Sequence, residues 1–297
     1  MIKNINNRNF FKLFIKQQSK ATNLHFNQTF NASNISRDVY ERNKDIIERH
    51  ESVSCNAERL LLVAKNAINA FIYNAQGQHL SNLGCLTSYS TLQEVRERMI
   101  NQYIENDKLQ RKDEVGRQIL LEKPRINHDS ANIEYLLSLP KNTFGFMGDR
   151  DFSSEERPKV TYMPDFELAY IYQRYKEIHD FIHTLLGFDV TVYDEIVVKW
   201  YEMVQLGFPS TGLSSFVGPL KFSQEEITRF NTEDLPMIIQ QAKQSQFIMN
   251  IYFEKEFETN IVNLFSIDQI IYFFCLKNKH DLRKRLGLTL DPKLKYE

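Results

Sequence analysis

The sequence contains few cysteines, and none of them forms the pairs that thiolate metal sites use. Cys55, Cys85 and Cys275 lie far apart in a chain of 297 residues, with no Cys-x-x-Cys spacing. This usage is typical of a reducing compartment, and it favours neither a disulfide framework nor a sulfur-ligated metal. We expect all three side chains to be buried thiols.

Long apolar runs are also missing. The longest unbroken run, Ile270–Leu276, has seven residues. A membrane-spanning helix needs about 20, and no secretory signal is evident either. Any contact of this chain with a membrane is therefore expected to be peripheral.

Acidic residues are absent from the first 37 positions, which contain six Lys and Arg residues. The remaining chain carries 31 basic against 38 acidic side chains, a net charge of −7. Because nucleic acid phosphates need a basic surface, this balance argues against a nucleic-acid partner.

The basic N-terminal segment has a helical repeat. Its basic residues recur every four positions: Arg8, Lys12, Lys16 and Lys20. On a helix they would form one stripe opposite an apolar side. An acid-free, basic, amphipathic N-terminus resembles a mitochondrial transit peptide. We therefore interpret residues 1–37 as a transit peptide, with a disordered, Asn-rich tail as the alternative.

The sequence pattern predicts that the rest of the chain is helical. Charged residues make up 25% and apolar residues 42%, which is ordinary for a globular protein that can bury a core without disulfides. Beyond residue 40 the apolar period stays near 3.6. The strand-like stretches 159–163 and 188–193 are short and isolated. We predict an all-α fold with a single multi-helix domain over residues 40–297.

Local signals mark several helix ends. Thr91 and Glu94 form a capping-box pattern at the start of "TLQEVRERMINQYI", and Ser223 and Glu226 form another before "EITRFNTEDLPMIIQQAKQ". Glycine and proline gather at 207–219, which predicts a turn-rich joint between helices.

The helix from Asp165 to Gly187 has the clearest pattern. Asp165 is placed as the N-cap and Gly187 as the C-terminal breaker. One apolar stripe runs along this helix: Leu168, Ile171, Tyr175, Ile178, Ile182 and Leu185. Steps of three and four residues require this stripe to face the core.

Three candidate metal ligands lie at the edge of that stripe. His179 and His183 are one turn apart, and Asp180 shares with them an arc of roughly 100°. Imidazole and carboxylate suit zinc or iron(II). Glu195, twelve residues after His183 and near the start of the next helix, could return to them across a helical hairpin as a fourth ligand.

Other interpretations of these residues stay open. A His-Asp-x-x-His pattern on a helix is more often a polar patch, and Glu195 could simply pair with Lys199 four residues later. A zincin would need Glu where Asp180 stands, and a di-iron bundle would need a second carboxylate-x-x-His. A His-Asp phosphohydrolase would need further ligands on distant helices.

The sequence around these ligands is more specific than the ligands alone. "ELAYIYQRYKEIHDFIHTLLGF" and "EIVVKWYEMVQLGFP" resemble the ubiquinone (coenzyme Q) biosynthesis protein four family, whose signature is His-Asp-x-x-His-x11-Glu. His179, Asp180, His183 and Glu195 match that signature position by position. Segments such as "ILLEKPRI" and "SSFVGPLKFS" extend the resemblance over about residues 57–292.

This resemblance implies a function. Its members are largely helical proteins, peripheral on the matrix side of the mitochondrial inner membrane, within a complex of ubiquinone-synthesising enzymes. A zinc ion is associated with the signature. The implied activity is a lyase that removes the ring carboxylate of 4-hydroxy-3-methoxy-5-polyprenylbenzoate, giving 2-methoxy-6-polyprenylphenol or a further hydroxylated ring. The alternative is a non-catalytic, lipid-binding organiser of the complex with a structural metal.

The resemblance defines the roles of some site residues more firmly than those of others. His179, His183 and Glu195 are the firmest ligands, whereas Asp180 is expected to be a ligand, an orienting group for a histidine, or the catalytic proton carrier. The polyprenyl tail needs an apolar groove. Phe181, Leu185 and Leu186 could line such a groove but are more typical of plain core.

The chain departs from the family pattern in three places. Asp194 stands where the family usually has Gly before the glutamate. Residues 144–158 are fewer than usual and lack the aromatic helix expected there. An insertion at about 262–280 interrupts the C-terminal match.

Overall fold

The computed structural model describes most of the chain, in six segments: residues 35–73, 77–103, 110–126, 158–163, 165–253 and 282–288. Nearly all of the predicted transit peptide, the short segment 144–157 and the insertion at about 262–280 lie outside these residues. The chain divides into two compact units. The first comprises residues 1–98, 158–173 and 206–210, and the second comprises 99–157, 174–205 and 211–297.

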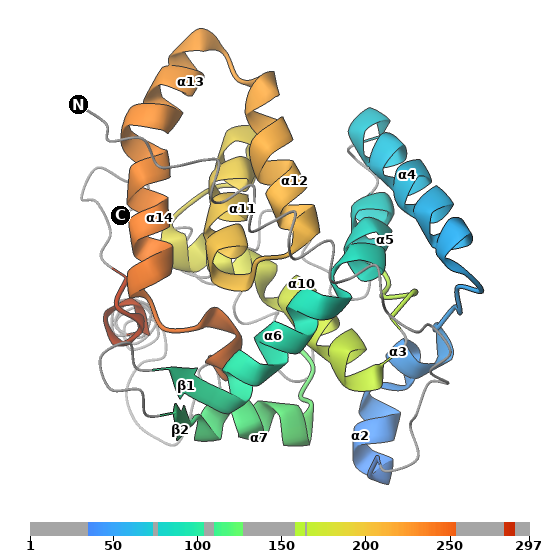
Figure 1. Cartoon of the computed structure of the whole chain (residues 1–297). Coiled ribbons are helices and arrows are strands. Elements are labelled where there is room, and N and C mark those ends of the chain that lie inside the picture. Colours follow the sequence, from blue (N-terminus) through green and yellow to red (C-terminus); the bar gives the residue numbers. More distant parts are fainter. Residues whose placement is uncertain are drawn as a thin grey trace, which may run out of the picture. The chain divides into compact units, whose positions relative to one another are not determined.

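Helices make up nearly all of the described structure (Figure 1), so the predicted all-α class is confirmed. The α-helices are α2 Arg37–Arg42, α3 Lys44–Glu48, α4 Asn56–Ile72, α5 Gly77–Thr87, α6 Tyr89–Ile100, α7 Glu114–Glu122, α10 Phe166–Leu186, α11 Val192–Leu206, α12 Pro209–Val217, α13 Gln224–Arg229 and α14 Leu235–Gln244. Short helical turns are η2 Gly218–Lys221, η3 Phe230–Asp234 and η4 Ile248–Asn250. None of the helices in the described residues is both long and apolar enough to cross a membrane.

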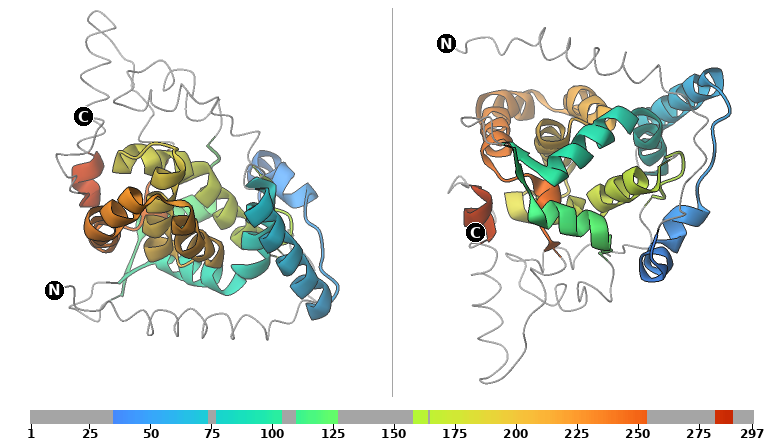
Figure 2. Two further views of the ribbon diagram at one scale, coloured as in Figure 1. Left: turned by 90° about the horizontal axis from the view of Figure 1, so that it is seen from above. Right: turned by 60° about the horizontal axis from the view of Figure 1, so that its bottom comes forward.

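In the first unit α4 lies alongside α5 (Figure 2). A polar contact joins them, because the Asn66 side-chain oxygen accepts from Asn82 and lies 3.2 Å from His79 Nδ1. Gly84 lets Tyr172 approach so closely that a Cβ there would meet its hydroxyl at 1.7 Å.

The predicted capping box at Thr91 is wrong. Helix α6 already begins at Tyr89, and the Thr91 hydroxyl donates to the Ser88 carbonyl at 2.9 Å from inside the first turn. The helix also ends earlier than expected, at Ile100, because the chain then turns into a two-stranded antiparallel sheet.

That sheet belongs to the second unit and consists of β1 Asn101–Tyr103 and β2 Gln110–Lys112. Asn101 pairs with Lys112, and α7 follows at once with the Asp113 side chain accepting from the Gly116 N–H at 2.9 Å. The stretches 159–163 and 188–193, which looked weakly strand-like, form no strand.

Helix α10 begins and ends as predicted. The Asp165 carboxylate accepts from the Leu168 N–H at 2.9 Å, and Gly187 ends the helix with φ +76°, a conformation that glycine adopts without strain. All six residues of the predicted apolar stripe are buried. Its two histidines are thereby held at the edge of the core.

The predicted turn-rich joint at 207–219 is mostly helix. Gly207, with φ +72°, ends α11, and α12 then starts at Pro209, a residue well suited to a first helical position. Gly218 follows α12 and packs against Ile196 of α11. Residues 207–219 therefore pack against α11 through Gly218.

The long helix predicted after Ser223 is real but interrupted. The Ser223–Glu226 capping box is confirmed at the start of α13. The chain then forms the π-helical turn Phe230–Asp234 before α14. Pro236, in the first turn of α14, lacks an N–H to continue the α-helical ladder, and the wider turn just before it accommodates that loss.

Candidate metal centre

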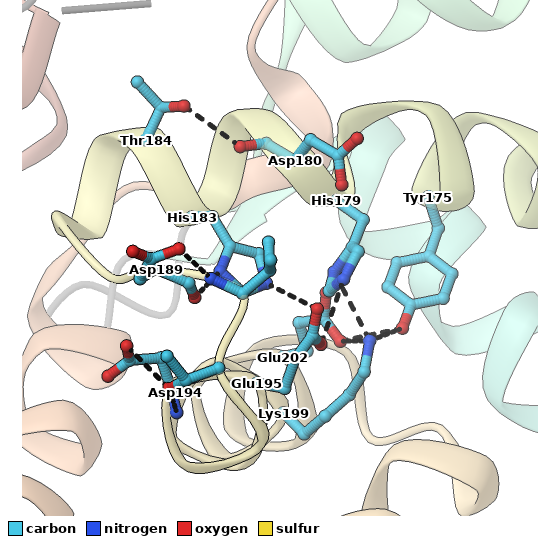
Figure 3. Close-up of polar contacts among 12 residues, drawn as sticks. Tyr175, His179, Asp180, His183, Thr184, Asp189, Asp194, Glu195, Lys199 and Glu202 are labelled. Atoms are coloured by element: carbon cyan, nitrogen blue, oxygen red, sulfur yellow. Dashed lines mark hydrogen bonds and ion pairs between the residues drawn. The ribbon is translucent and has the colours of Figure 1, made fainter. Parts of the chain in front are cut away.

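Helices α10 and α11 face each other through polar side chains that belong to the second unit. From α10 come Tyr175, His179 and His183, and from α11 come Glu195, Lys199 and Glu202. Spacings of three and four residues put each set on one face of its helix. Figure 3 shows the resulting ladder of contacts between the two helices.

The outer end of this ladder brings three of the predicted ligands together. The Nε2 atoms of His179 and His183 each lie 3.4 Å from a different oxygen of Glu195. The two rings meet edge to face, with centroids 4.8 Å apart. One ligand atom from each of the three residues lies within 4.8 Å of the other two, a spacing that can hold a metal ion.

The loop after α10 orients His183. Its Nδ1 lies 2.8 Å from the Asp189 carbonyl, which the turn at Gly187 brings back toward the helix. A carbonyl only accepts hydrogen bonds, so the ring proton is on Nδ1. In the neutral ring, the Nε2 lone pair consequently faces Glu195.

His179 is oriented by a glutamate that the sequence analysis missed. Its Nδ1 lies 2.5 Å from Glu202 Oε1. The other oxygen of Glu202 accepts from the Tyr175 hydroxyl at 2.7 Å and from Lys199 Nζ at 2.8 Å. Lys199 thus makes its ion pair with Glu202, and the alternative that it serves Glu195 is wrong.

Only a weak signal in the sequence pointed to Glu202. Glu195, Lys199 and Glu202 recur at steps of four and three, which places them on one stripe of α11. Such a stripe is usually a solvated face. Only the packing of α11 on α10 buries the Glu202 side chain completely.

The electrostatic field at this site favours a positive charge between the carboxylates of Glu195 and Glu202. Burial alone would raise the pKa of Glu202, but Lys199 and His179 lower it to about 2. Burial opposes ionisation of Glu195 too, yet the two histidines hold its pKa well below the usual range. Burial and Lys199 would lower the pKa of His179, but Glu202 and Glu195 outweigh them and raise it. Burial lowers the pKa of His183, which favours its neutral ring.

A metal ion fits this arrangement. His183 Nε2 is buried and has no hydrogen-bond partner among the described residues, although it faces a carboxylate oxygen. A buried polar atom without a partner costs free energy, and a cation between the two acceptors would remove that cost. Two imidazole nitrogens and one carboxylate oxygen are a donor set that zinc accepts.

Comparison with known proteins places this site in a family. Residues 49–270 match the sequence profile of the coenzyme Q (ubiquinone) biosynthesis protein Coq4, a stretch that includes the whole candidate centre. The chain belongs to the Coq4 family. The resemblance inferred from the signature residues is therefore confirmed.

Several Coq4 relatives are similar over most of their length. The mitochondrial ubiquinone biosynthesis protein COQ4 homolog 2 of Paramecium tetraurelia is 51% identical over 65% of this chain and 88% of the relative. COQ4 of Meyerozyma guilliermondii is 32% identical over 83% and 77%, and the human COQ4 homolog is 30% identical over 82% and 83%. Both are also named as mitochondrial proteins.

A solved structure shares the fold. The crystal structure of a Nostoc punctiforme protein assigned to ubiquinone biosynthesis superposes with a TM-score of 0.50. It covers 80% of this chain and 100% of the other at 15% identity. At that identity the likeness supports the helical fold alone.

Asp180, the second residue of the His-Asp-x-x-His-x11-Glu pattern, does not join the other three. It is absent from the group of residues whose ligand atoms meet, and Figure 3 shows its carboxylate beside α10, above His179. Its backbone carbonyl accepts from the Thr184 hydroxyl at 3.1 Å. The shared helical arc therefore does not bring Asp180 to the ligand point, and its role stays a prediction.

The structure also describes the other residues that were predicted near the site. Phe181 stacks on Phe253 with ring centroids 5.2 Å apart, and Leu185 and Leu186 are buried, as core residues would be. Asp194, the residue before Glu195 that departs from the expected family pattern, accepts from the Thr191 hydroxyl at 2.9 Å. Burial raises the pKa of Asp194.

Proposed function

We propose that this Coq4 family member is a zinc-dependent lyase of ubiquinone biosynthesis. Its reaction is removal of the C1 carboxylate of 4-hydroxy-3-methoxy-5-polyprenylbenzoate to give 2-methoxy-6-polyprenylphenol. The observation that carries the proposal is the convergence of His179, His183 and Glu195, with both Nε2 atoms directed at one carboxylate.

The reaction places defined demands on the protein. The bond between the ring and the carboxylate breaks, CO₂ leaves, and the electron pair stays on the ring carbon, which takes up a proton. His179, His183 and Glu195 would hold the zinc ion, which when bound supplies a Lewis acid for the substrate carboxylate or phenolate. Asp180 remains our candidate for the group that carries the proton.

The number of protein ligands favours catalysis over a purely structural metal. Structural zinc sites are usually closed by four protein ligands, whereas catalytic sites have three and keep a position for water or substrate. Among the residues that the structure describes, three form the group and Asp180 is not one of them. The Glu195 side chain is 36% exposed, so the outer end of the centre is accessible from solvent.

We also propose where the chain works. Its relatives are named mitochondrial and act in ubiquinone biosynthesis. We infer that it binds peripherally to the lipid surface on the matrix side of the inner membrane, together with other enzymes of the ubiquinone biosynthetic complex. Carbonate extraction and protease protection of isolated mitochondria test this placement. Release by carbonate with protection by the intact inner membrane is the expected result, and digestion in intact mitoplasts would contradict it.

The metal content and the activity of one purified preparation test the proposed reaction. The wild-type chain should contain zinc and release CO₂ from a polyprenyl hydroxybenzoate, and His183→Ala should lose both. The matched control is His79→Ala, which removes a histidine from the first unit and should keep both. Turnover by His183→Ala without bound metal would contradict the zinc-dependent mechanism.

Asp180→Asn tests the proton carrier separately. We expect full zinc content with greatly reduced turnover, because the amide cannot deliver a proton but leaves the three ligands in place. Full turnover with full zinc would remove Asp180 from the mechanism. Lost zinc would instead make it a ligand or the support of one.

A further inference from the structure

We propose that Glu202 is a positioning residue that holds the ring proton of His179 on Nδ1 and so presents the Nε2 lone pair to the metal. The inference rests on the proposed metal site, which it extends inward by two turns of α11. Nothing in the His-Asp-x-x-His-x11-Glu pattern includes Glu202.

The short contact defines where the proton lies. His179 Nδ1 and Glu202 Oε1 are 2.5 Å apart, and two bare acceptors cannot approach so closely. Lys199 Nζ lies 3.3 Å from the same nitrogen, but it has better acceptors in Glu202 Oε2 and the Tyr175 hydroxyl. The proton between ring and carboxylate therefore sits on Nδ1, and Nε2 is left to bind the metal.

Glu202 itself is held firmly enough to impose this orientation. Its side chain is fully buried, and its second oxygen accepts from Tyr175 of α10 and Lys199 of α11. Both oxygens are thus engaged, Oε1 by His179 of α10 and Oε2 by one residue from each helix. A carboxylate that orients a metal-binding histidine in this way raises the basicity of the ligand and fixes its tautomer.

The two histidines differ in a way that permits a test. The proton of His183 is held by the Asp189 main-chain carbonyl, which a substitution does not remove. The proton of His179 is held by a side chain. A change at Glu202 should therefore alter one ring and leave the other as an internal reference.

The competing explanation is a buried ion pair that only stabilises the fold. A buried carboxylate with a lysine partner needs no metal nearby, and breaking such a pair destabilises a protein whatever its function. Loss of stability alone therefore does not discriminate. The tautomer of His179 does, because a purely structural ion pair between Glu202 and Lys199 makes no demand on it.

Glu202→Gln is the sharpest variant because it keeps the shape of the side chain. Lys199 and Tyr175 both donate toward Oε2, so the amide oxygen is expected there and the NH₂ group toward His179. An NH₂ group needs an acceptor, which would draw the ring proton to Nε2. Glu202→Gln should consequently move the His179 ring proton from Nδ1 to Nε2 and weaken metal binding there.

The experiment uses the full chain labelled with ¹⁵N-histidine. Two-bond ¹H–¹⁵N spectra of the metal-free protein, recorded at a pH above the raised pKa of His179 so that both rings are neutral, report which nitrogen of each ring carries the proton, and titration with Zn²⁺ against a competing chelator gives the affinity. We expect Nδ1–H on His179 in the wild type, Nε2–H in Glu202→Gln, and zinc affinity reduced about 10–100-fold in the variant. The His183 signals should stay unchanged before zinc is added.

The matched control is Glu177→Gln. Glu177 is equally buried on α10 and pairs with Arg125 at 2.6 Å, away from both histidines. This variant should lose stability but keep the tautomer and the zinc affinity. If Glu202→Gln does not fold, Glu202→Asp replaces it, because the shorter carboxylate withdraws from Nδ1 and should also weaken zinc binding.

The outcomes separate the two proposals. A wild-type chain that binds no zinc overturns the proposed metal site, whatever the tautomer. A wild type that binds zinc while His179 carries its proton on Nε2 in the metal-free state overturns the role of Glu202. Zinc affinity that falls in Glu202→Gln without a change of tautomer, or a tautomer that changes without a fall in affinity, overturns it as well.

Discussion

His183 Nε2 lies 3.4 Å from Glu195 Oε1, and both atoms are acceptors when the ring is neutral. The main-chain carbonyl of Asp189 holds the ring proton on the opposite nitrogen. This relationship is the reason to place a cation between α10 and α11.

Glu195→Gln should weaken zinc binding more strongly than any change beyond the ligands themselves. It removes the charge that faces both imidazoles, so the loss should exceed the roughly 10–100-fold typical of outer partners. Competition titration with a zinc chelator measures it. Glu225→Gln, an exposed residue of α13, is the control and should bind zinc as the wild type does. Equal affinities for the two variants would exclude Glu195 as a ligand.

Removing the metal should lower the thermal stability of the chain. A ligand at about 100 times its Kd stabilises the folded state by about 2.7 kcal/mol, because it binds the native protein and not the unfolded one. Differential scanning calorimetry with zinc and then with excess chelator should show this difference for the wild type. The same treatment should leave the melting of His183→Ala unchanged. A chelator effect of equal size in that variant would place the metal elsewhere.

Gly218→Ala should disturb the N-terminal half of α11. A Cβ at Gly218 would lie 2.5 Å from Ile196 Cγ1, directly after the ligand Glu195 in the chain. We expect destabilisation of about 1–3 kcal/mol from overpacking, measured by urea unfolding. Ile196→Ala removes both Cγ1 and Cδ1, the two atoms nearest the new Cβ, so the double variant should lose less stability than the two single changes together, and a double-mutant cycle gives the coupling. Strictly additive effects would contradict this contact.

Gly116→Ala should cost more than Gly218→Ala. The new Cβ would meet the Met99 carbonyl oxygen at 1.9 Å and the Asn250 side chain at 2.6 Å. A main-chain carbonyl cannot move aside as the tip of an isoleucine can. Urea unfolding of the two variants side by side checks the order, and a smaller effect at Gly116 would show that this packing is not as tight as described.

The fold was predictable where local signals determine it. Asp165, Gly187 and the apolar stripe between them are enough to define α10, since caps and helical periodicity act over a few residues. The same periodicity put His179 and His183 on one edge. The spacing between His183 and Glu195 could be interpreted because Gly187 ends α10 and the chain then turns back toward that helix.

Other features depend on packing that no local pattern reports. Glu202 became part of the site because α11 buries it against α10, and a charged stripe usually means the opposite. Asp180 shares the histidines' arc, but its carboxylate is not among the ligand atoms that meet, which a helical wheel cannot show. Pro209 was interpreted as part of a joint although a proline also begins helices well.

We propose that this chain decarboxylates a polyprenyl hydroxybenzoate at the centre formed by His179, His183 and Glu195. The most direct measurement follows labelled CO₂ released from a substrate carrying ¹³C in its carboxyl group, with zinc-loaded wild-type protein. We predict stoichiometric release of labelled CO₂ with formation of the polyprenyl phenol, and its loss in His183→Ala. A folded, zinc-loaded wild-type chain that binds the substrate but releases no label would contradict the claim and favour a non-catalytic organiser.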